Sequence, residues 1–222
     1  MVEIGEKTSG RFVKVNPKDG EDPQVQQIID LYTPEIDRIM NEEIGVLETG
    51  CNRMGRGSSL LGNWLCDLMK EATGADVALH NRTGIRSDLK AGAVRLRDLY
   101  QVSPFRNTLV TMKLQGTELV DLLTRAMSHD KYFLEMSGVS YTMRGGKLED
   151  VLVGDGAVDP QKLYTVVTNS FLAAGGDGHE IFTRGRDRND TLKDLLDVHK
   201  KWVRANSPVK LTFTERVHVK EN

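Results

Sequence analysis

The amino-acid sequence predicts an α/β domain of the α+β kind, in which a mixed β-sheet is flanked by helices. Helical and strand-like segments are interleaved along the chain, and both short hairpin-like turns and longer crossovers connect them. Tight turns join antiparallel strands, whereas parallel strands need crossovers, so a sheet that contains both arrangements is expected. The sequence contains no internal repeat and no low-complexity linker, which favours a single main domain.

The first predicted helix begins at Asp22, which suits an N-cap, and Pro23 suits the first helical turn. Apolar residues then recur at i, i+3 and i+4 spacing as far as Met40, so one face of this helix is expected to be buried. Pro34 is expected to kink or split the helix, because proline lacks a backbone N–H group and clashes with the preceding turn.

Strand-like runs of β-branched and aromatic residues and further amphipathic segments follow along the chain. Ser58 and Ser59 are plausible N-caps for the second helix. The expected strands are 11–15, 44–48, 75–79, 108–114, 139–143, 148–153, 163–168 and 209–214, and the expected further helices are 59–73, 117–127 and 191–206.

The composition excludes several classes of protein. The 222 residues are 39% hydrophobic and 28% charged, with a formal net charge of −2, so neither a nucleic-acid-binding surface nor an acidic tail is indicated. Cys51 and Cys66 are too few for a disulfide framework or a zinc site. No run approaches the roughly 20 apolar residues of a membrane span, and residues 1–10 lack the apolar core of a signal peptide. The sequence as written predicts a cytoplasmic protein, or a piece whose targeting information lies elsewhere.

Familiar catalytic motifs are missing. The five histidines are scattered without H-x-x-x-H spacing, and the sequence has neither a G-x-S-x-G elbow nor a P-loop. No catalytic residue is therefore assigned in this chain, and any hydrolytic chemistry is expected to come from outside it.

The segment 169–178 carries the most informative pattern. It follows the strand-like run 163–168, and its three glycines permit positive φ angles and a close approach to a ligand. Phe171 offers an aromatic face and Asp177 an acceptor for hydroxyl groups, a combination suited to holding a nucleoside. The alternative is a plain turn with a buried phenylalanine and a turn-forming aspartate.

Two segments that precede or follow regular elements carry arginines. Arg53 and Arg56 lie in a glycine-containing loop before the helix at 59–73, where guanidinium groups and the helix N-terminus together favour an anion. Asn81 and Arg86 lie in a turn at the end of a predicted strand. The alternative interpretation of the arginines is ordinary surface charge.

A fourth segment contains Pro104, which can fix a turn that presents Phe105 at a loop tip. Phe105 and Phe171 could then stack on the two faces of one base, and stacking contributes roughly 1–3 kcal/mol per base. The alternative is that both rings belong to the core. The shared position of these segments at strand ends and in loops favours a site.

Four ordered segments resemble the C-terminal, substrate-binding domain of the 5′-nucleotidase family, which includes UDP-sugar hydrolases and cyclic-nucleotide phosphodiesterases. They are 59–67, 75–86, 104–108 and 169–178. The resemblance extends over about 44–182 and implies the mixed-sheet fold of that family. It divides the chain into a lead-in from another domain (1–21), a linking helix (22–43) and the substrate-binding domain (44–222).

The resemblance implies roles for individual residues. Phe105 and Phe171 would clamp the base, and Asp177 would accept hydrogen bonds from ribose hydroxyl groups. Asn81 would touch the base or the ribose, and Arg86 would hold phosphate or ribose oxygens. The family has one more arginine just before the second helix. Its nearest equivalent is Arg56, with Arg53 as the alternative because the match is one residue out of register.

Some residues depart from the family pattern. The usual Asn-Gly-Gly-Gly-Ile-Arg is replaced by a segment with Arg82 and Thr83, so two side chains enter a loop that is normally bare. Arg82 could add charge to the site or narrow it. Ser58 replaces an acidic residue, and His179 stands where an aromatic residue often follows Gly-Gly-Asp-Gly.

The catalytic part of the family is a separate N-terminal metallophosphatase domain that carries two divalent metal ions. The resemblance therefore implies no metal or cofactor in this chain, and the isolated chain is predicted to hydrolyse nothing. The expected partners are a nucleotide or nucleoside and that N-terminal domain, with no nucleic acid. The resemblance suggests that the full-length protein is periplasmic or extracellular. The alternatives are a stand-alone nucleotide-binding module without chemistry, and a scaffold that binds a partner.

Overall fold

The computed structural model describes residues 12–16, 20–55, 57–129 and 132–220. The chain divides into two compact units, Met1–Ile39 and Met40–Asn222, which are considered separately.

Helix α1 (Pro23–Met40) begins as predicted, since the Asp22 carboxylate accepts hydrogen bonds from the backbone N–H groups of Gln24 and Val25 at 2.8 and 3.2 Å. The expectation that Pro34 splits the helix is wrong: the helix runs through it, because proline removes one hydrogen bond from a ladder that continues on both sides. The expectation of a buried face is also wrong, since α1 has no buried residue. Periodicity sets which side chains share a face, but not whether another element covers it.

The predicted strand at 11–15 is absent over 12–15, and residue 11 lies outside the described residues.

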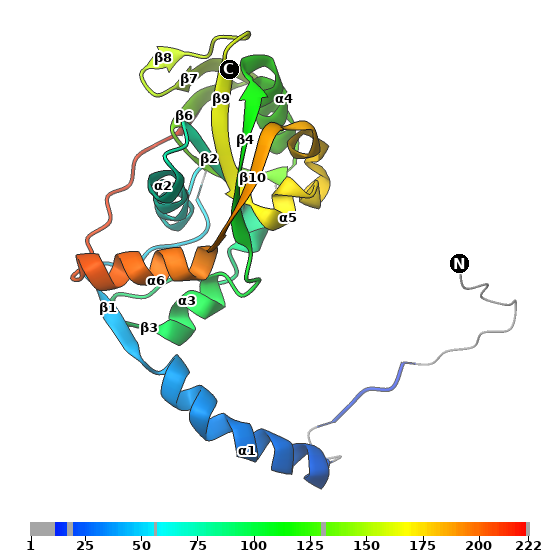
Figure 1. Ribbon diagram of the computed structural model, residues 1–222, viewed down its shortest axis with the longest axis vertical. Helices are drawn as coiled ribbons and strands as arrows, with labels where there is room; N and C mark the ends of the chain where they lie inside the picture. The colour runs from blue at the N-terminus through cyan, green and yellow to red at the C-terminus, as the bar shows by residue number, and fades with distance from the viewer. Residues whose placement is uncertain (1–11, 17–19, 56, 130–131, 221–222) are drawn as a thin grey trace, which may run out of the picture. The chain divides into compact units, whose positions relative to one another are not determined.

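The larger unit is built around a five-stranded sheet in the order β10-β4-β9-β2-β5, shown in Figure 1. β2 and β9 are parallel and the other neighbours are antiparallel, so the prediction of a mixed sheet is confirmed. The strands are β2 (Val77–Asn81), β4 (Thr108–Gln115), β5 (Leu134–Ser137), β9 (Leu163–Asn169) and β10 (Arg186–Asp194).

Helices cover both faces of this sheet (Figure 1). Side chains alternate along β2, so Ala78 packs with α2, while Val77 and Leu79 pack with α4 on the opposite face. The covering helices are α2 (Leu60–Thr73), α4 (Gly116–Met127) and the short α5 (Ser170–Ala173). Ser59 is the N-cap of α2, as predicted, because its side chain accepts a hydrogen bond from the Gly62 N–H group at 3.0 Å.

Two smaller sheets complete the unit. One has the order β11-β6-β7-β8, and the other pairs β1 with β3 beside α3 and α6. Their elements are β1 (Glu43–Leu47), β3 (Gly92–Arg95), α3 (Leu96–Val102), β6 (Val139–Arg144), β7 (Lys147–Val153), β8 (Gly156–Ala157), α6 (Leu195–Asn206) and β11 (Val217–Lys220).

Two predicted elements near the C-terminus need correction. The predicted helix 191–206 begins only at Leu195, because Asp194 caps it through hydrogen bonds to the N–H groups of Leu196 and Asp197. The predicted strand 209–214 does not form, since beyond an isolated bridge from Val209 to Leu47 it has no strand to pair with. The last strand is β11 instead.

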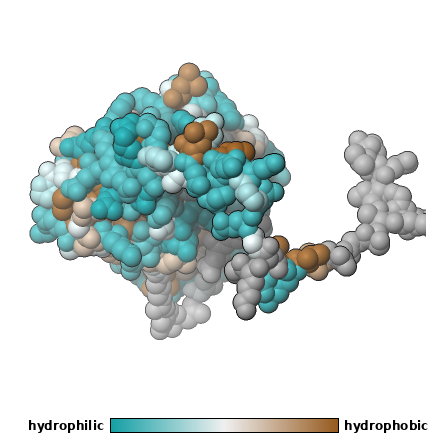
Figure 2. Space-filling view, turned by 90° about the horizontal axis from the view of Figure 1, so that it is seen from below, coloured by the Kyte–Doolittle hydropathy of each residue, from teal (hydrophilic) through white to brown (hydrophobic). Residues whose placement is uncertain are grey.

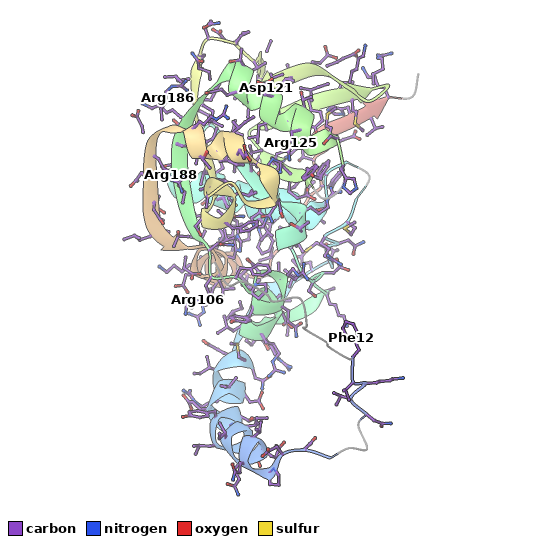
Figure 3. The ribbon with its side chains drawn as sticks, turned by 90° about the vertical axis from the view of Figure 1, so that its right-hand side faces the viewer. Phe12, Arg106, Asp121, Arg125, Arg186 and Arg188 are labelled. Atoms are coloured by element: carbon purple, nitrogen blue, oxygen red, sulfur yellow. The ribbon has the colours of Figure 1, made fainter. Side chains whose placement is uncertain are left out.

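Strand β10 was not predicted, because its sequence is highly charged. It is one of the two edge strands of the sheet and has β4 as its neighbour on one side, which allows polar side chains along its length. Figure 3 shows Arg186 and Arg188 on this outer strand. On the face shown in Figure 2, hydrophilic residues predominate and hydrophobic ones form small, separate groups. In the part of the chain that the structure describes, no helix is both long and apolar enough to cross a bilayer.

The core contains two histidines that we expect to make stability depend on pH. His80 and His199 are each 1% exposed, and burial lowers the pKa of His80 to about 4 and that of His199 to about 3. In the unfolded chain both have pKa values near 6.5. Below that pH the unfolded state therefore binds protons on these rings, while the rings of the folded state stay neutral. The stability that these two histidines contribute is therefore fully present above about pH 6.5, and it is lost as the pH falls through about 4 for His80 and about 3 for His199.

Because of His199 alone, the free energy of unfolding is expected to fall by about 2 kcal/mol when the pH is lowered from 7.5 to 5. Urea denaturation at the two pH values should show a loss smaller by that amount in His199→Gln than in the wild type. The same substitution at His218 is the control, because this histidine is exposed in the folded protein. Equal losses in wild type and His199→Gln would contradict the prediction.

Candidate functional site

Three chain segments meet at one edge of the central sheet because of how its strands are paired. β2 and β9 run in parallel, so their carboxyl ends, Asn81 and Asn169, lie side by side. β4 is antiparallel to β9 and pairs Leu109 with Asn169, so β4 begins where β9 ends. The residues after β2, after β9 and before β4 therefore gather at the same place.

A cavity of about 460 Å³ lies at this edge. Five of the six residues predicted to bind substrate line it, although they come from segments up to 96 positions apart. The lining residues are Asn81, Thr83, Gly84, Arg86, Phe105, Asn107, Phe171 and Asp177. The predicted residues are thus brought together, while their contact with a nucleotide stays a prediction.

The two phenylalanines both line the cavity and are substantially exposed. Phe105 is 53% exposed and Phe171 is 45% exposed, so neither belongs to the core and the alternative of two core residues is wrong. Neither ring stacks on another aromatic residue of the described chain. The Phe171 ring lies against Gly176, where a Cβ atom would come within 2.5 Å of it, so the glycine is required for this ring position.

Asp177 reaches the cavity through an unusual backbone conformation. Its φ is 51°, and its neighbours Gly175 and Gly178 have φ values of 87° and 75°. The left-handed region is unfavourable for residues with a Cβ atom, so the surrounding contacts must hold Asp177 there. Its Oδ2 atom accepts hydrogen bonds from Asn81 Nδ2 at 2.9 Å and Thr83 Oγ1 at 2.6 Å.

Asn81 is the centre of this polar network. It is 5% exposed, and its Nδ2 atom donates to Thr83 Oγ1 at 2.8 Å as well as to Asp177. Its Oδ1 atom accepts from Asn169 Nδ2 at 2.9 Å, and Asn169 in turn accepts from the Leu172 N–H group. The parallel pairing of β2 and β9 makes this asparagine contact possible. Both amide hydrogens of Asn81 are used within the protein, so the residue orients its neighbours.

The arginines differ in their position. Arg86 is exposed, lines the cavity and donates from Nη1 to the Thr83 carbonyl at 3.1 Å. Arg53 does not line the cavity, and its Nη1 atom donates to the Ile85 carbonyl at 3.1 Å. Arg56 lies outside the described residues, so the choice between Arg53 and Arg56 stays open.

Comparisons with known proteins settle the family. A model of the 5′-nucleotidase C-terminal domain matches residues 36–184. This chain belongs to the 5′-nucleotidase C-terminal domain family.

Among curated relatives, the Trifunctional nucleotide phosphoesterase protein YfkN of Bacillus subtilis (strain 168) is 28% identical over 207 residues, which cover 83% of this chain and 14% of that protein. Protein UshA of Escherichia coli (strain K12) is 28% identical over 221 residues, covering 91% of this chain and 40% of that protein. The chain thus spans two fifths or less of the length of these relatives.

Solved structures of related proteins have a similar fold. The 5′-nucleotidase precursor from Thermus thermophilus superposes with a TM-score of 0.79 at 27% identity, covering 90% of this chain and 43% of that one. NAD nucleotidase from Haemophilus influenzae has a TM-score of 0.74 at 24% identity, covering 90% of this chain and 42% of that one, and supports the fold alone. The prediction of a 5′-nucleotidase C-terminal fold is confirmed.

Arg82, a departure from the usual 5′-nucleotidase pattern, does not point into the cavity. It is 8% exposed, and its Nε atom pairs with Glu135 Oε1 at 2.8 Å. Its Nη2 atom donates to the Gly57 carbonyl, and its Cζ atom lies 3.8 Å from the centroid of the Phe133 ring. Glu135 also accepts from the Ser59 N–H group at the start of α2, at 3.0 Å. Arg82 therefore joins the loop after β2 to the N-terminus of α2, and the expectation that it charges or narrows the site is wrong.

Two other departures from the family pattern, His179 and Ser58, are buried away from the cavity. His179 is fully buried, its Nε2 atom lies 2.9 Å from the Tyr132 carbonyl, and its ring packs edge-on against Phe182, as an aromatic residue would. Burial lowers the pKa of His179, which favours the neutral ring. Ser58 is 2% exposed and does not line the cavity.

Sequence reasoning missed three lining residues, Thr83, Gly84 and Asn107. Thr83 and Gly84 lie between the predicted Asn81 and Arg86, and Asn107 follows Phe105 by two positions, so the motifs themselves were the signal. Asn107 Oδ1 accepts from Ser170 Oγ at 3.1 Å, which ties the segment before β4 to α5.

No metal centre is found in the described part of the chain, where no three His, Cys, Asp or Glu side chains gather. The Asp-x-His pairs at Asp177 and Asp197 have the spacing of some metal ligands, but their histidines, His179 and His199, are buried in the core.

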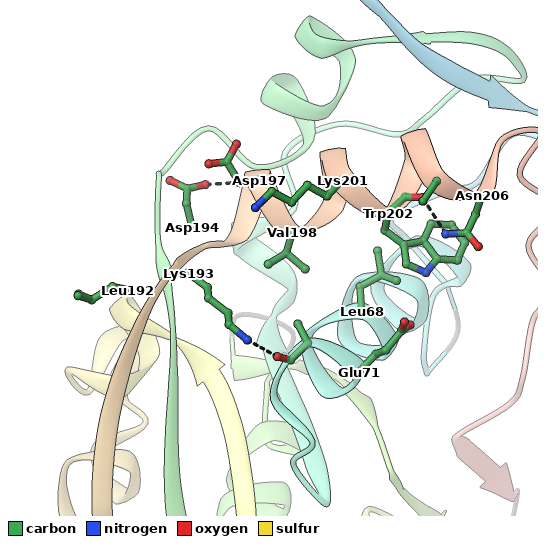
Figure 4. A pocket seen from close by; sticks show the side chains of 12 residues that line it. Leu68, Glu71, Leu192, Lys193, Asp194, Asp197, Val198, Lys201, Trp202 and Asn206 are labelled. Atoms are coloured by element: carbon green, nitrogen blue, oxygen red, sulfur yellow. Dashed lines mark hydrogen bonds between the residues drawn. The ribbon is translucent and has the colours of Figure 1, made fainter.

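A larger hollow of about 680 Å³ lies between α2, the end of β10 and α6, and Figure 4 shows it. Leu68, Val198 and Trp202 supply its apolar part. The Lys193 ammonium group donates to the Ala72 carbonyl at 2.6 Å, which caps the C-terminal end of α2. None of the predicted binding residues lines this hollow.

Proposed function

We propose that this domain recognises the nucleoside part of a nucleotide and presents its phosphate to a metal-dependent phosphoester hydrolase domain of the 5′-nucleotidase type. The observation that supports it most is the gathering of Asn81, Arg86, Phe105, Phe171 and Asp177 around one cavity. Membership of the 5′-nucleotidase C-terminal domain family supports the same function.

Each side chain contributes a different kind of contact. The exposed rings of Phe105 and Phe171 would stack on the base. Every base has a flat aromatic face, so stacking accepts any of them. The Asp177 carboxylate would accept hydrogen bonds from sugar hydroxyl groups. The Arg86 guanidinium group would form charge-assisted hydrogen bonds with phosphate oxygens. These contacts bind and orient the substrate, and none of them breaks a bond.

The hydrolytic step belongs, in this proposal, to a metallophosphatase domain outside this chain. Two divalent metal ions held there would supply the activated nucleophile. The full-length protein would act in the periplasm or outside the cell.

Removing either ring is expected to weaken nucleotide binding. Titration calorimetry of the chain with a panel of nucleosides and nucleoside monophosphates should show a loss of about 1–3 kcal/mol for Phe105→Ala and for Phe171→Ala, or roughly 5- to 150-fold in Kd. Phe213 is a matched control, since it is 49% exposed but does not line the cavity, and Phe213→Ala should bind like the wild type. Equal affinity in the wild type and the Phe105→Ala/Phe171→Ala double variant would rule out the clamp. Phosphate release from AMP by the purified chain would rule out a purely binding role.

A further inference from the structure

Thr83 connects the loop after β2 to the Asp177 carboxylate by a hydrogen bond. A carboxylate only accepts hydrogen bonds, so the 2.6 Å contact between Thr83 Oγ1 and Asp177 Oδ2 uses the threonine hydroxyl hydrogen. The hydroxyl oxygen then accepts from Asn81 Nδ2 at 2.8 Å, and the same Nδ2 atom also donates to Asp177 Oδ2 at 2.9 Å. Asn81, Thr83 and Asp177 thus form a closed triangle of hydrogen bonds.

The triangle divides the two carboxylate oxygens between the protein and a ligand. Both donors converge on Oδ2, and within the described part of the chain no donor contacts Oδ1. Asp177 lines the cavity, so Oδ1 is the oxygen available to a bound molecule. Asn81 is itself held by Asn169 at the end of β9, which anchors the triangle to the sheet.

We propose that Thr83 is a positioning residue that fixes the Asp177 carboxylate for the hydroxyl groups of a sugar, and so sets a preference of this cavity for ribonucleosides over their deoxy forms. The inference rests on the proposed function. Its physical reason is that Asp177, at φ 51°, stands on a glycine-rich turn whose own backbone offers little restraint, so side-chain hydrogen bonds must select one orientation. A carboxylate already held in place loses less freedom when a hydroxyl group binds.

Thr83 contacts the two proposed binding groups through different atoms: its side chain bonds to Asp177, and its backbone carbonyl bonds to Arg86. Arg86 donates to the backbone carbonyl of Thr83, not to its side chain. Replacing the Thr83 side chain therefore leaves the anchor of Arg86 in place. Loss of the hydroxyl should weaken discrimination at the sugar without changing discrimination at the phosphate, a split that general damage to the loop would not produce.

The test compares Thr83→Val, which keeps the branched shape but lacks the hydroxyl, with Thr83→Ser, which keeps the hydroxyl. Calorimetry measures Kd for a ribonucleoside, its 2′,3′-dideoxy form and its 5′-monophosphate, using the base that the wild type binds best. The wild type should prefer the ribonucleoside by about tenfold or more, the range of a hydrogen bond to a charged group. We expect this ratio to fall to about threefold or less in Thr83→Val and to stay within about twofold of wild type in Thr83→Ser.

The ratio between monophosphate and nucleoside should be the same in wild type and Thr83→Val. Thr124→Val is a matched control, because the hydroxyl it removes bonds to the Val120 carbonyl on the surface of α4. An unchanged sugar preference in Thr83→Val, or an equal fall in the sugar and phosphate ratios, would overturn the positioning role. If the wild type bound no nucleoside at all, the proposed function itself would fail, which distinguishes the two outcomes.

Discussion

Glu135→Ala is expected to lower the free energy of unfolding by about 3–5 kcal/mol, because it leaves the Arg82 guanidinium group buried without its counter-ion. The Arg82 side chain is 9% exposed and that of Glu135 is fully buried, so water cannot replace the lost partner. The substitution also removes the acceptor for the Ser59 N–H group at the start of α2. Urea denaturation at neutral pH measures the change.

Two comparisons make this prediction specific to a buried charge. Replacing both partners, as Arg82→Met/Glu135→Leu, should recover a large part of the loss, since an apolar pair leaves no unpaired charge. Glu149→Ala breaks the exposed pair with Arg144, whose atoms are 3.2 Å apart, and should cost about 1 kcal/mol or less. A Glu135→Ala loss no larger than that of Glu149→Ala would refute the assignment.

Gly138→Ala is expected to destabilise the fold by about 2–5 kcal/mol, from backbone strain and steric overlap together. Gly138 is the single residue between β5 and β6, with φ at 75°. A Cβ atom there would lie 2.0 Å from the Asp76 carbonyl oxygen, so the backbone itself would have to move.

Gly146 allows the two contributions to be separated. It has the same φ of 75°, but a Cβ atom would meet nothing within 4 Å. Gly146→Ala should therefore cost only the left-handed strain, about 1–2 kcal/mol. The difference in unfolding free energy between the two variants, measured by denaturation, gives the steric contribution. Equal losses in the two variants would show that the backbone at Asp76 moves at no cost, and would contradict the prediction.

The prediction of each strand depended on its sequence pattern more than on its burial: β5 is buried, but Glu135 and Ser137 interrupt its apolar pattern, and it was not predicted. β4 and β9 are rich in β-branched and apolar residues, most of which are buried, so sequence patterns found them. β10 was missed, since an edge strand can be charged along its length. The apolar stripe of α1 correctly predicted a helix and wrongly predicted its burial, because burial depends on a partner that the local sequence does not describe.

The candidate site could be predicted at the level of residue types, and less well at the level of contacts. Phe105, Phe171 and Asp177 stand in recognisable motifs, and the structure places them around one cavity. The role of Asn169 depends on the parallel pairing of β9 with β2, a contact across 88 positions that no local pattern reveals. The inward turn of Arg82 likewise depends on Glu135, which lies on another strand.

The meeting of three segments at one sheet edge also bears on how such a domain can diversify. Each segment is a short excursion between elements that are anchored in the core, so it can change in sequence while the register of β2, β9 and β4 is kept. A segment exchanged at its strand boundaries would therefore lie at the same sheet edge, but it would have to keep the hydrogen bonds to its neighbours, such as Asn81 to Asp177 and Ser170 to Asn107. A library of chimeras could thus vary the lining of the cavity by exchanging the linked segments together, while the central sheet stays unchanged.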